Sequence, residues 1–369
     1  MGPLTLLIKP ASGSCNMRCK YCFYADEAEN REVASYGMMS DATLEAVVRF
    51  GLENARGSCT FAFQGGEPTL AGLDFYRRLV AMQRAHNTRG LRVYNTIQTN
   101  GYLIDREWAD FLARERFLTG LSLDGGKDVH DLYRVDARGE GTFARVMRAS
   151  QTLAAAGAEF NILTVVTAQT ARSIGKIYGF FKRNHFRYQQ YIACLDPIGA
   201  VRGGMPYSLT PKLYGEFLCK LFDLWYADFM RGEYVSIRWF DDLVHMCKGR
   251  AAQSCGMRGV CGPQIVIEAD GGVYPCDFYV LDGLRLGTVG ENTLEEMEQK
   301  RTALAFIEQS RPVEEKCRAC RWYPLCRGGC RRDREQPDGS IGLNYFCESY
   351  EAFFAHCADR LMQVSRMVR

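Results

Sequence analysis

Three cysteines with the spacing of metal ligands lie near the start of this 369-residue chain, directly after a short apolar run. Cys15, Cys19 and Cys22 form the pattern C-x3-C-x2-C. Three thiolates are one ligand short of a tetrahedral site, whereas structural zinc sites are normally closed. The first histidine of the chain is His86, far from this group in sequence. The pattern therefore favours a [4Fe–4S] cluster with one iron left open for a small-molecule ligand.

Eight further cysteines lie between residues 255 and 347, and their spacing also suits metal binding. Four thiolates fit zinc and an iron–sulfur cluster equally well, so spacing alone leaves both groups open. Eight ligands make two complete sites if one of the last five joins the group that precedes it. These cysteines are Cys255, Cys261 and Cys276, followed by Cys317, Cys320, Cys326, Cys330 and Cys347. The other five cysteines, scattered singly, are expected to be ordinary buried thiols.

Two other stretches have residue types that could do chemistry. In QGGEP, Gly65 and Gly66 would let the backbone approach a ligand closely. Asp277 directly follows Cys276. A carboxylate beside a metal-bound thiolate is normally disfavoured because the two charges have the same sign, so its position needs an explanation. It either orients its loop by hydrogen bonding or acts as a general base with a perturbed pKa. Four polar residues expected on the same rim could bind a peptide backbone: Tyr24, Gln64, Gln98 and Asn100.

Alternating strands and helices are predicted to position these residues. Six β-rich runs are separated by amphipathic segments with polar starts. This alternation indicates a parallel sheet with helices outside, either doubly wound or closed as an α/β barrel, with catalytic groups at the carboxyl ends of the strands. The predicted strands are 4–10, 59–65, 93–99, 118–124, 160–166 and 188–194, and the predicted helices are 41–55, 73–87, 105–116, 142–157 and 173–184.

The pattern changes after residue 200. A long aromatic-rich helix is predicted over 210–233, then a strand or turn leading into another helix over 236–249. The cysteine-rich segment beyond 250 has little apolar periodicity, which suggests a fold held by metal as much as by a core. We therefore predict two domains, 1–235 and 236–369.

Composition excludes several classes of function. With 46 Lys and Arg against 43 Asp and Glu, the net charge of +3 gives no footprint for nucleic acid. No apolar run approaches the length needed to span a bilayer, and the N-terminus lacks a signal peptide. A cytoplasmic protein is expected, and the basic run RGGCRRDR near residue 330 is expected to be solvated surface.

The cysteine loop resembles the signature of the radical S-adenosylmethionine (SAM) enzymes. Cys261-x9-Gly271-x4-Cys276 together with the later cysteines is similar to the SPASM extension of that superfamily. Over essentially the whole chain the resemblance is closest to anaerobic sulfatase-maturating enzymes, in stretches such as LLIKPAS, YCFY, FAFQGGEPTLAGL and VYPCDFYVLD. The resemblance implies a partial (β/α)6 barrel and a C-terminal SPASM domain with two auxiliary [4Fe–4S] clusters, which makes three clusters in all.

The resemblance also implies an activity, which is oxidation of a Cys or Ser in a sulfatase polypeptide to Cα-formylglycine by a 5′-deoxyadenosyl radical. Asp277 would take the thiol or hydroxyl proton, and the surplus electron would leave through the auxiliary clusters. All eleven clustered cysteines would be iron ligands, and a flavodoxin- or ferredoxin-type protein would donate electrons. Residues expected to contact SAM are Tyr21, Gly65, Gly66, Glu67, Ser122, Arg134 and Leu195.

Two alternatives remain at this point. The first is a SPASM maturase that crosslinks or epimerises a ribosomal peptide. Such enzymes often carry a leader-binding domain before the cysteine loop, and only fourteen residues precede Cys15 here. The second is a non-enzymatic iron–sulfur or zinc protein, which would leave the GGEP stretch and the open three-cysteine group without a role.

Overall fold

The computed structural model describes residues 2–336 and 338–368, and these residues divide into two compact units. Both units are discontinuous in sequence. The first contains residues 1–122, 131–161 and 263–305, and the second contains 123–130, 162–262 and 306–369. These units do not coincide with the expected domains 1–235 and 236–369, which remain a prediction.

The first unit is built on a mainly parallel sheet. Its strands lie in the order β10-β9-β8-β1-β2-β3-β4, and each neighbouring pair from β8 to β4 is parallel. In β2 buried and half-buried residues alternate, as expected for a strand whose successive side chains point to opposite faces. The strands are β1 (Leu4–Ile8), β2 (Ser58–Phe63), β3 (Arg92–Thr99), β4 (Leu118–Ser122), β8 (Ile265–Ile267), β9 (Gly272–Tyr274) and β10 (Gly287–Thr288).

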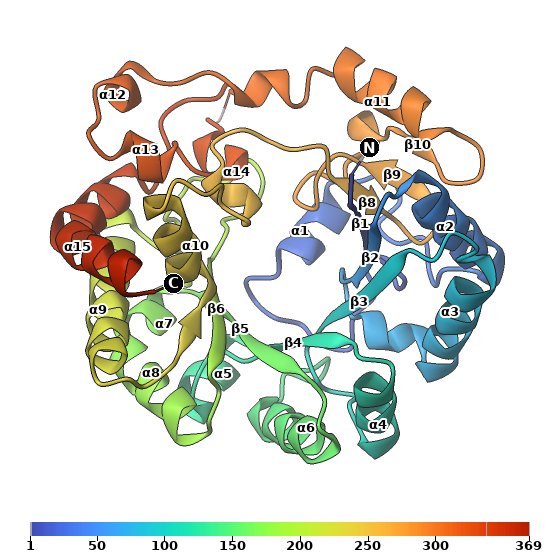
Figure 1. Cartoon of the computed structure of the whole chain (residues 1–369), viewed down its shortest axis with the longest axis horizontal. Coiled ribbons are helices and arrows are strands. Elements are labelled where there is room, and N and C mark those ends of the chain that lie inside the picture. Colours follow the sequence, from blue (N-terminus) through green and yellow to red (C-terminus); the bar gives the residue numbers. More distant parts are fainter. Residues whose placement is uncertain (1, 337, 369) are drawn as a thin grey trace. The chain divides into compact units, whose positions relative to one another are not determined.

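Helices that follow the strands cover the outside of this sheet, as Figure 1 shows for α2, α3 and α4. Ser40 caps α2 and Asp105 caps α4, each accepting a backbone N–H three residues on. The predicted β/α alternation is thus confirmed, with boundaries shifted by one or two residues. The helices are α1 (Phe23–Glu29), α2 (Asp41–Asn54), α3 (Leu73–His86), α4 (Arg106–Arg114), α6 (Phe143–Ala156) and α11 (Leu294–Ala303); the 3-10 helix η1 (Pro68–Ala71) precedes α3.

Three short strands near Cys276 were not predicted. Strand β8 pairs in parallel with β1, and β9 pairs antiparallel with β8. Val266, Tyr274 and Val280 form a buried cluster against Leu7 of β1. The segment was expected to depend on metal as much as on a core, yet this part of it is a sheet extension with apolar packing. Strands of two or three residues are too short to show periodicity, so no pattern along the chain predicts them.

The second unit combines three parallel strands with long helices. The predicted strands β5 (Phe160–Val166) and β6 (Tyr188–Ala193) pair with each other, and β6 pairs with β7 (Ser236–Ile237). The C-terminal helix α15 (Cys347–Met367) was not predicted; it packs along α9 (Pro211–Met230), with the rings of Phe222 and Phe353 5.8 Å apart. The remaining helices are α7 (Ala168–Arg172), α8 (Ile174–Arg183), α10 (Arg238–Cys247), α12 (Glu315–Arg318), α13 (Tyr323–Cys326) and α14 (Arg331–Arg334), while α5 (Lys127–Tyr133) crosses from one unit to the other.

No helix in the part of the chain that the structure describes is long and apolar enough to cross a membrane. The described strands do not close into a ring, so the sheet is open.

Candidate active site

The first cysteine group lies in the loop between β1 and α1, at the carboxyl end of the strand. Cys22 directly precedes α1, and its backbone N–H donates to the carbonyl of Cys19 at 3.1 Å. The N–H groups of Arg18 and Lys20 donate to the carbonyls of Val135 and Tyr133, which ties the loop to residues 133–135. All three cysteines are partly buried. Burial raises the pKa of the Cys15 thiol to about 11, so metal binding there must displace a proton.

The GGEP turn after β2 packs directly against this cysteine loop. Gly66 has a φ of +48°, and a Cβ there would lie 2.2 Å from the carbonyl oxygen of Ser14. The N–H of Glu67 donates to the same oxygen at 2.8 Å. A Cβ at Gly65 would lie 2.5 Å from the side chain of Lys9. The close approach that these glycines permit is therefore, in this structure, an approach to the protein's own chain.

The carboxylate of Glu67 is a structural junction between strand ends. It is 1% exposed and accepts hydrogen bonds from the backbone and hydroxyl of Thr69, the hydroxyl of Thr99 and the N–H of Asn100, at 2.6 to 3.0 Å. These bonds join the turn after β2 to the end of β3. The side chain of Glu67, a residue expected to contact SAM, is thus already engaged by four donors.

The other expected SAM contacts divide between the two units. In the first unit, the guanidinium of Arg134 lies over the ring of Tyr21 at 5.5 Å, and both residues are buried. Ser122 is at the end of β4 and accepts a hydrogen bond from Gln98 at 3.1 Å. Leu195 belongs to the second unit, two residues beyond β6, and is partly buried.

Asp277 is buried, 9% exposed, and its carboxylate is held by side chains from three other segments. Tyr24 Oη and Gln64 Nε2 both donate to Oδ2, at 2.8 and 2.7 Å. The ammonium of Lys9 lies 3.7 Å from Oδ1, which has no hydrogen-bond partner among the described residues. Asp277 is therefore not a surface carboxylate; it is a buried carboxyl group with one oxygen that has no hydrogen-bond partner among the described residues.

A second carboxylate lies behind Lys9. Glu27 of α1 accepts from Lys9 Nζ at 2.5 Å and from the N–H of Val280 at 2.7 Å. Burial raises the pKa of Glu27 to about 7 against the opposing charge of Lys9, and burial likewise raises the pKa of Asp277. One lysine cation therefore faces two buried carboxylates. Lys9 and Glu27 were not predicted from the sequence, although a lysine at the end of the apolar run LTLLIK is a signal that could have identified Lys9.

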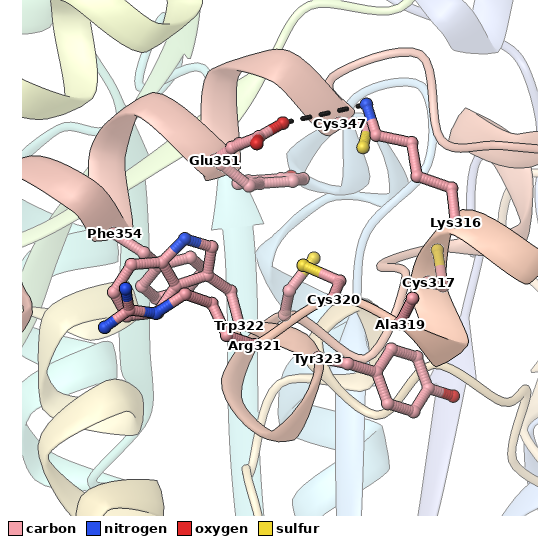
Figure 2. Close-up of a pocket in the computed structure, with 12 residues that line it drawn as sticks. Lys316, Cys317, Ala319, Cys320, Arg321, Trp322, Tyr323, Cys347, Glu351 and Phe354 are labelled. Atoms are coloured by element: carbon pink, nitrogen blue, oxygen red, sulfur yellow. Dashed lines mark ion pairs between the residues drawn. The ribbon is translucent and has the colours of Figure 1, made fainter.

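Four cysteines of the second unit surround a cavity of about 420 Å³ (Figure 2). They are Cys317, Cys320, Cys326 and Cys347, and the rings of Trp322 and Tyr323 also line it. Lys316 and Glu351 pair at its edge with a separation of 3.6 Å. Four thiols around such a volume are a donor set that suits an iron–sulfur cluster. No three His, Cys, Asp or Glu side chains of the described chain converge on a point as ligands of a single metal ion do.

Three more predicted ligands in the second unit lie near one another. Burial is the main cause of the raised pKa of the Cys330 thiol, and the charges of Cys255 and Cys261 also raise it. The N–H of Cys261 donates to the hydroxyl of Ser310 at 2.9 Å. Cys330, fourth of the late cysteines, thus groups with the earlier pair. Cys276 belongs to the first unit, two residues after the end of β9 and directly before Asp277.

The basic run near residue 330 is not solvated surface, and that expectation was wrong. Arg331, Arg332 and Arg334 are buried. Their guanidinium groups donate to backbone carbonyls, among them Phe306 for Arg331 and Gly259 for Arg334. A buried guanidinium needs such acceptors, and loops without regular structure have carbonyls to offer. These arginines stabilise the irregular loops that carry the cysteines.

The scattered cysteines and two histidines have the ordinary surroundings expected of them, with two exceptions in burial. Cys59, Cys194 and Cys357 are buried, whereas Cys219 and Cys247 are only partly buried. His130 is fully buried, and His86 lies on the surface of α3, 3.2 Å from Glu45.

Comparison with known proteins agrees with the geometry. Residues 10–181 match the family model of the radical SAM superfamily, and residues 259–321 match that of an iron-sulfur cluster-binding domain, SPASM. The chain is 50% identical to the cysteine-type anaerobic sulfatase-maturating enzyme of Clostridium perfringens over the full length of both. It is 31% identical to the serine-type enzyme of Bacteroides thetaiotaomicron, over 96% of this chain and 90% of that one.

A solved structure described as native anSMEcpe with bound AdoMet and Cp18Cys peptide matches with a TM-score of 0.95 and 49% identity, over all of both chains. The predicted partial (β/α)6 barrel with a SPASM domain is thereby confirmed, as are SAM and iron–sulfur clusters as its cofactors. Full-length identity at this level does not fit a peptide-crosslinking maturase or a non-enzymatic metalloprotein. This chain therefore belongs to the anaerobic sulfatase-maturating enzymes, radical SAM oxidoreductases that generate formylglycine.

Proposed function

We propose that this chain oxidises a cysteine side chain of a sulfatase polypeptide to Cα-formylglycine, with Asp277 as the base that accepts the thiol proton. The choice of cysteine over serine is supported by the 50% identity to a cysteine-type relative, against 31% to a serine-type one. The observation that carries the base assignment is the buried carboxylate of Asp277, with one oxygen uncommitted.

The neighbours of Asp277 fit this role. Tyr24 and Gln64 both bond to Oδ2, so they fix the plane of the carboxylate and leave Oδ1 to accept a proton. Lys9 supplies a cation 3.7 Å from Oδ1 that supports the ionised form before reaction. A general base needs this combination of fixed geometry and an available oxygen.

We assign the cofactor sites to the same residues that were expected from the sequence. When bound, the N-terminal cluster and SAM supply the 5′-deoxyadenosyl radical that removes a hydrogen from the target residue. Cys15, Cys19 and Cys22 would hold that cluster. Backbone at Gly65, Gly66 and Glu67 and the side chains of Tyr21, Ser122, Arg134 and Leu195 would contact SAM. Buried Arg134 offers a fixed cation for its carboxylate.

Two auxiliary clusters account for the remaining eight cysteines. The cavity supports Cys317, Cys320, Cys326 and Cys347 as one ligand set. Counting then leaves Cys255, Cys261, Cys276 and Cys330 for the other. A reconstituted chain should bind about twelve irons, in three clusters of four. About four irons, or zinc in place of iron, would contradict this assignment.

The experiment for the base compares Asp277→Asn with Asp282→Asn, an exposed aspartate five residues away. Each reconstituted protein is incubated anaerobically with SAM, a reductant and a peptide containing the sulfatase cysteine motif. Asp277→Asn should still cleave SAM but form almost no aldehyde, as measured by the peptide mass that marks sulfur replaced by oxygen together with the loss of two hydrogens. Asp282→Asn should match the unmodified enzyme. Normal aldehyde yield from Asp277→Asn would remove the base role.

Two further parts of the proposal concern the surroundings of the enzyme. The electron donor would be a flavodoxin- or ferredoxin-type protein, and the location the cytoplasm. In the described chain none of the sixteen cysteines is in a disulfide, which supports a reducing compartment. Reduced flavodoxin or ferredoxin should replace dithionite in the peptide assay, and failure of both would refute the donor class.

A further inference from the structure

Two N–H groups lie within hydrogen-bond distance of the sulfur of Cys15. The backbone N–H of Met17 is 3.4 Å from Cys15 Sγ, and the side-chain amide Nδ2 of Asn100 is 3.7 Å from it. The first donor is local to the cysteine loop. The second comes from the end of β3, 85 residues along the chain.

The amide of Asn100 is fixed in the orientation that presents its NH₂ group to Cys15. Its Oδ1 accepts from the N–H of Tyr102 at 2.9 Å, which only an oxygen can do. Its Nδ2 also donates to Asn16 Oδ1 at 2.8 Å, and its backbone N–H donates to the buried carboxylate of Glu67 at 2.7 Å. The side chain is 8% exposed. Asn100 was expected to face a peptide substrate, but its polar atoms are used within the protein.

A hydrogen bond to a cluster thiolate affects reduction directly. Reduction adds an electron to the cluster and increases the negative charge on its sulfurs. A donor to one of these sulfurs therefore stabilises the reduced state more than the oxidised state. Burial strengthens the effect, because water cannot substitute for the lost donor.

We propose that Asn100 is a positioning residue that raises the reduction potential of the N-terminal cluster through its hydrogen bond to Cys15. The inference rests on the proposed assignment of Cys15 as a ligand of that cluster. Glu67 contributes indirectly, because it anchors the backbone from which Asn100 reaches the sulfur.

The variants are chosen to separate the bond from the fold. Asn100→Asp keeps an oxygen that can accept from Tyr102 but replaces the donor near Cys15 with an anionic oxygen. Asn100→Leu removes the polar group altogether. Asn95→Asp is the matched control, because Asn95 lies in β3, the strand that Asn100 directly follows, and exchanges two hydrogen bonds with Gln83 at 2.8 and 3.0 Å.

The measurement is a redox titration of the reconstituted full-length enzyme followed by electron paramagnetic resonance. The N-terminal cluster is identified as the signal that changes when SAM is added. At a fixed ambient potential, Asn100→Leu should lower the ratio of reduced to oxidised cluster about threefold to tenfold. One tenfold step corresponds to about 59 mV for a one-electron couple. Asn100→Asp should lower the ratio further, and Asn95→Asp should leave it unchanged.

Three results would count against the proposal. Unchanged potentials in both Asn100 variants would overturn it. Loss of the SAM-sensitive signal and of about four irons in both variants would show a purely structural role. If Cys15→Ala keeps the SAM-sensitive signal, the ligand assignment fails instead, so failure of the proposed function is distinguished from failure of this inference.

Discussion

Substitution of Gly66 by alanine should remove the N-terminal cluster and leave the two auxiliary clusters in place. The added Cβ would lie 2.2 Å from the carbonyl oxygen of Ser14, the residue directly before Cys15. That oxygen already accepts the N–H of Glu67 at 2.8 Å. The added Cβ would be fixed to the backbone of the turn, and the Ser14 oxygen belongs to the backbone of the cysteine loop. Neither atom can therefore move without shifting the turn or the loop.

The expected cost has two parts. A left-handed φ of +48° costs an L-residue about 1 to 2 kcal/mol. The overlap is more than about 1 Å inside a normal van der Waals contact, and overpacking of this kind costs about 1 to 3 kcal/mol. Together they reach about 2 to 5 kcal/mol, which is enough to displace a short loop from its packed position.

Gly72→Ala provides the matched control in the same segment. Gly72 also has a positive φ, +82°, here with a ψ of 156°, a backbone region nearly restricted to glycine, but a Cβ there would meet no atom within 4 Å. Only a conformational cost of about 1 to 3 kcal/mol applies. This variant should bind about twelve irons and cleave SAM, whereas Gly66→Ala should bind about eight and cleave little or none.

The assay is iron content per chain, combined with release of 5′-deoxyadenosine under reducing conditions. If Gly66→Ala binds as much iron as Gly72→Ala and cleaves SAM at the same rate, the close packing of the turn against the cysteine loop does not support the cluster. Loss of soluble protein for both variants would mean that the strain of a positive φ alone is decisive, which also refutes the reasoning.

Three other predictions concern the remaining ionic and cysteine groups. Cys347→Ser should remove one cluster and reduce aldehyde yield while SAM cleavage continues; iron analysis and the peptide assay together check this. Arg31→Met should lower the free energy of unfolding by about 3 to 5 kcal/mol, because it leaves the fully buried Glu268, 2.6 Å from Arg31, without its cation. Thermal unfolding measures this loss. A shift in the unfolding temperature as small as that of Arg49→Met, which breaks an exposed ion pair, would contradict the prediction. The third prediction is pH dependence. The pKa of Glu27 is raised from 4.5 to about 7, so its contribution to stability is greatest below pH 4.5 and is lost as the pH rises through 7. Unfolding midpoints of Glu27→Gln should therefore approach or exceed those of the unmodified enzyme as the pH rises from about 5 to about 8, and a constant difference would refute the shift.

Much of the fold was predictable because its signals are local. The six predicted strands and the helices between them agree with β1 to β6 and their helices, since each element carries its own periodicity and many helices carry a capping residue. Strands β7 to β10 have only two or three residues each and form because a neighbouring strand offers its edge. Of these, only β7, residues 236–237, was predicted, and only as a strand or turn. Helix α15 was not predicted from the sequence. The arginines near 330 were misread because charge normally indicates solvent, and nothing local revealed the loop carbonyls around them.

The sequence by itself determined which residues are expected to bind metal, because C-x3-C-x2-C and the later spacings restrict ligand geometry within a short loop. It also identified Asp277 as chemically unusual from its position beside Cys276. Only the tertiary structure decided how that carboxylate is held. The carboxylate is contacted by Lys9, Tyr24 and Gln64, and Lys9 also pairs with Glu27, across separations of up to 268 residues. No pattern along the chain records these contacts, because they form only when three strand ends fold together. The same reason hid the amide of Asn100 beside Cys15, since a polar residue at a strand end has the same sequence signal whether it faces a substrate or the protein's own sulfur.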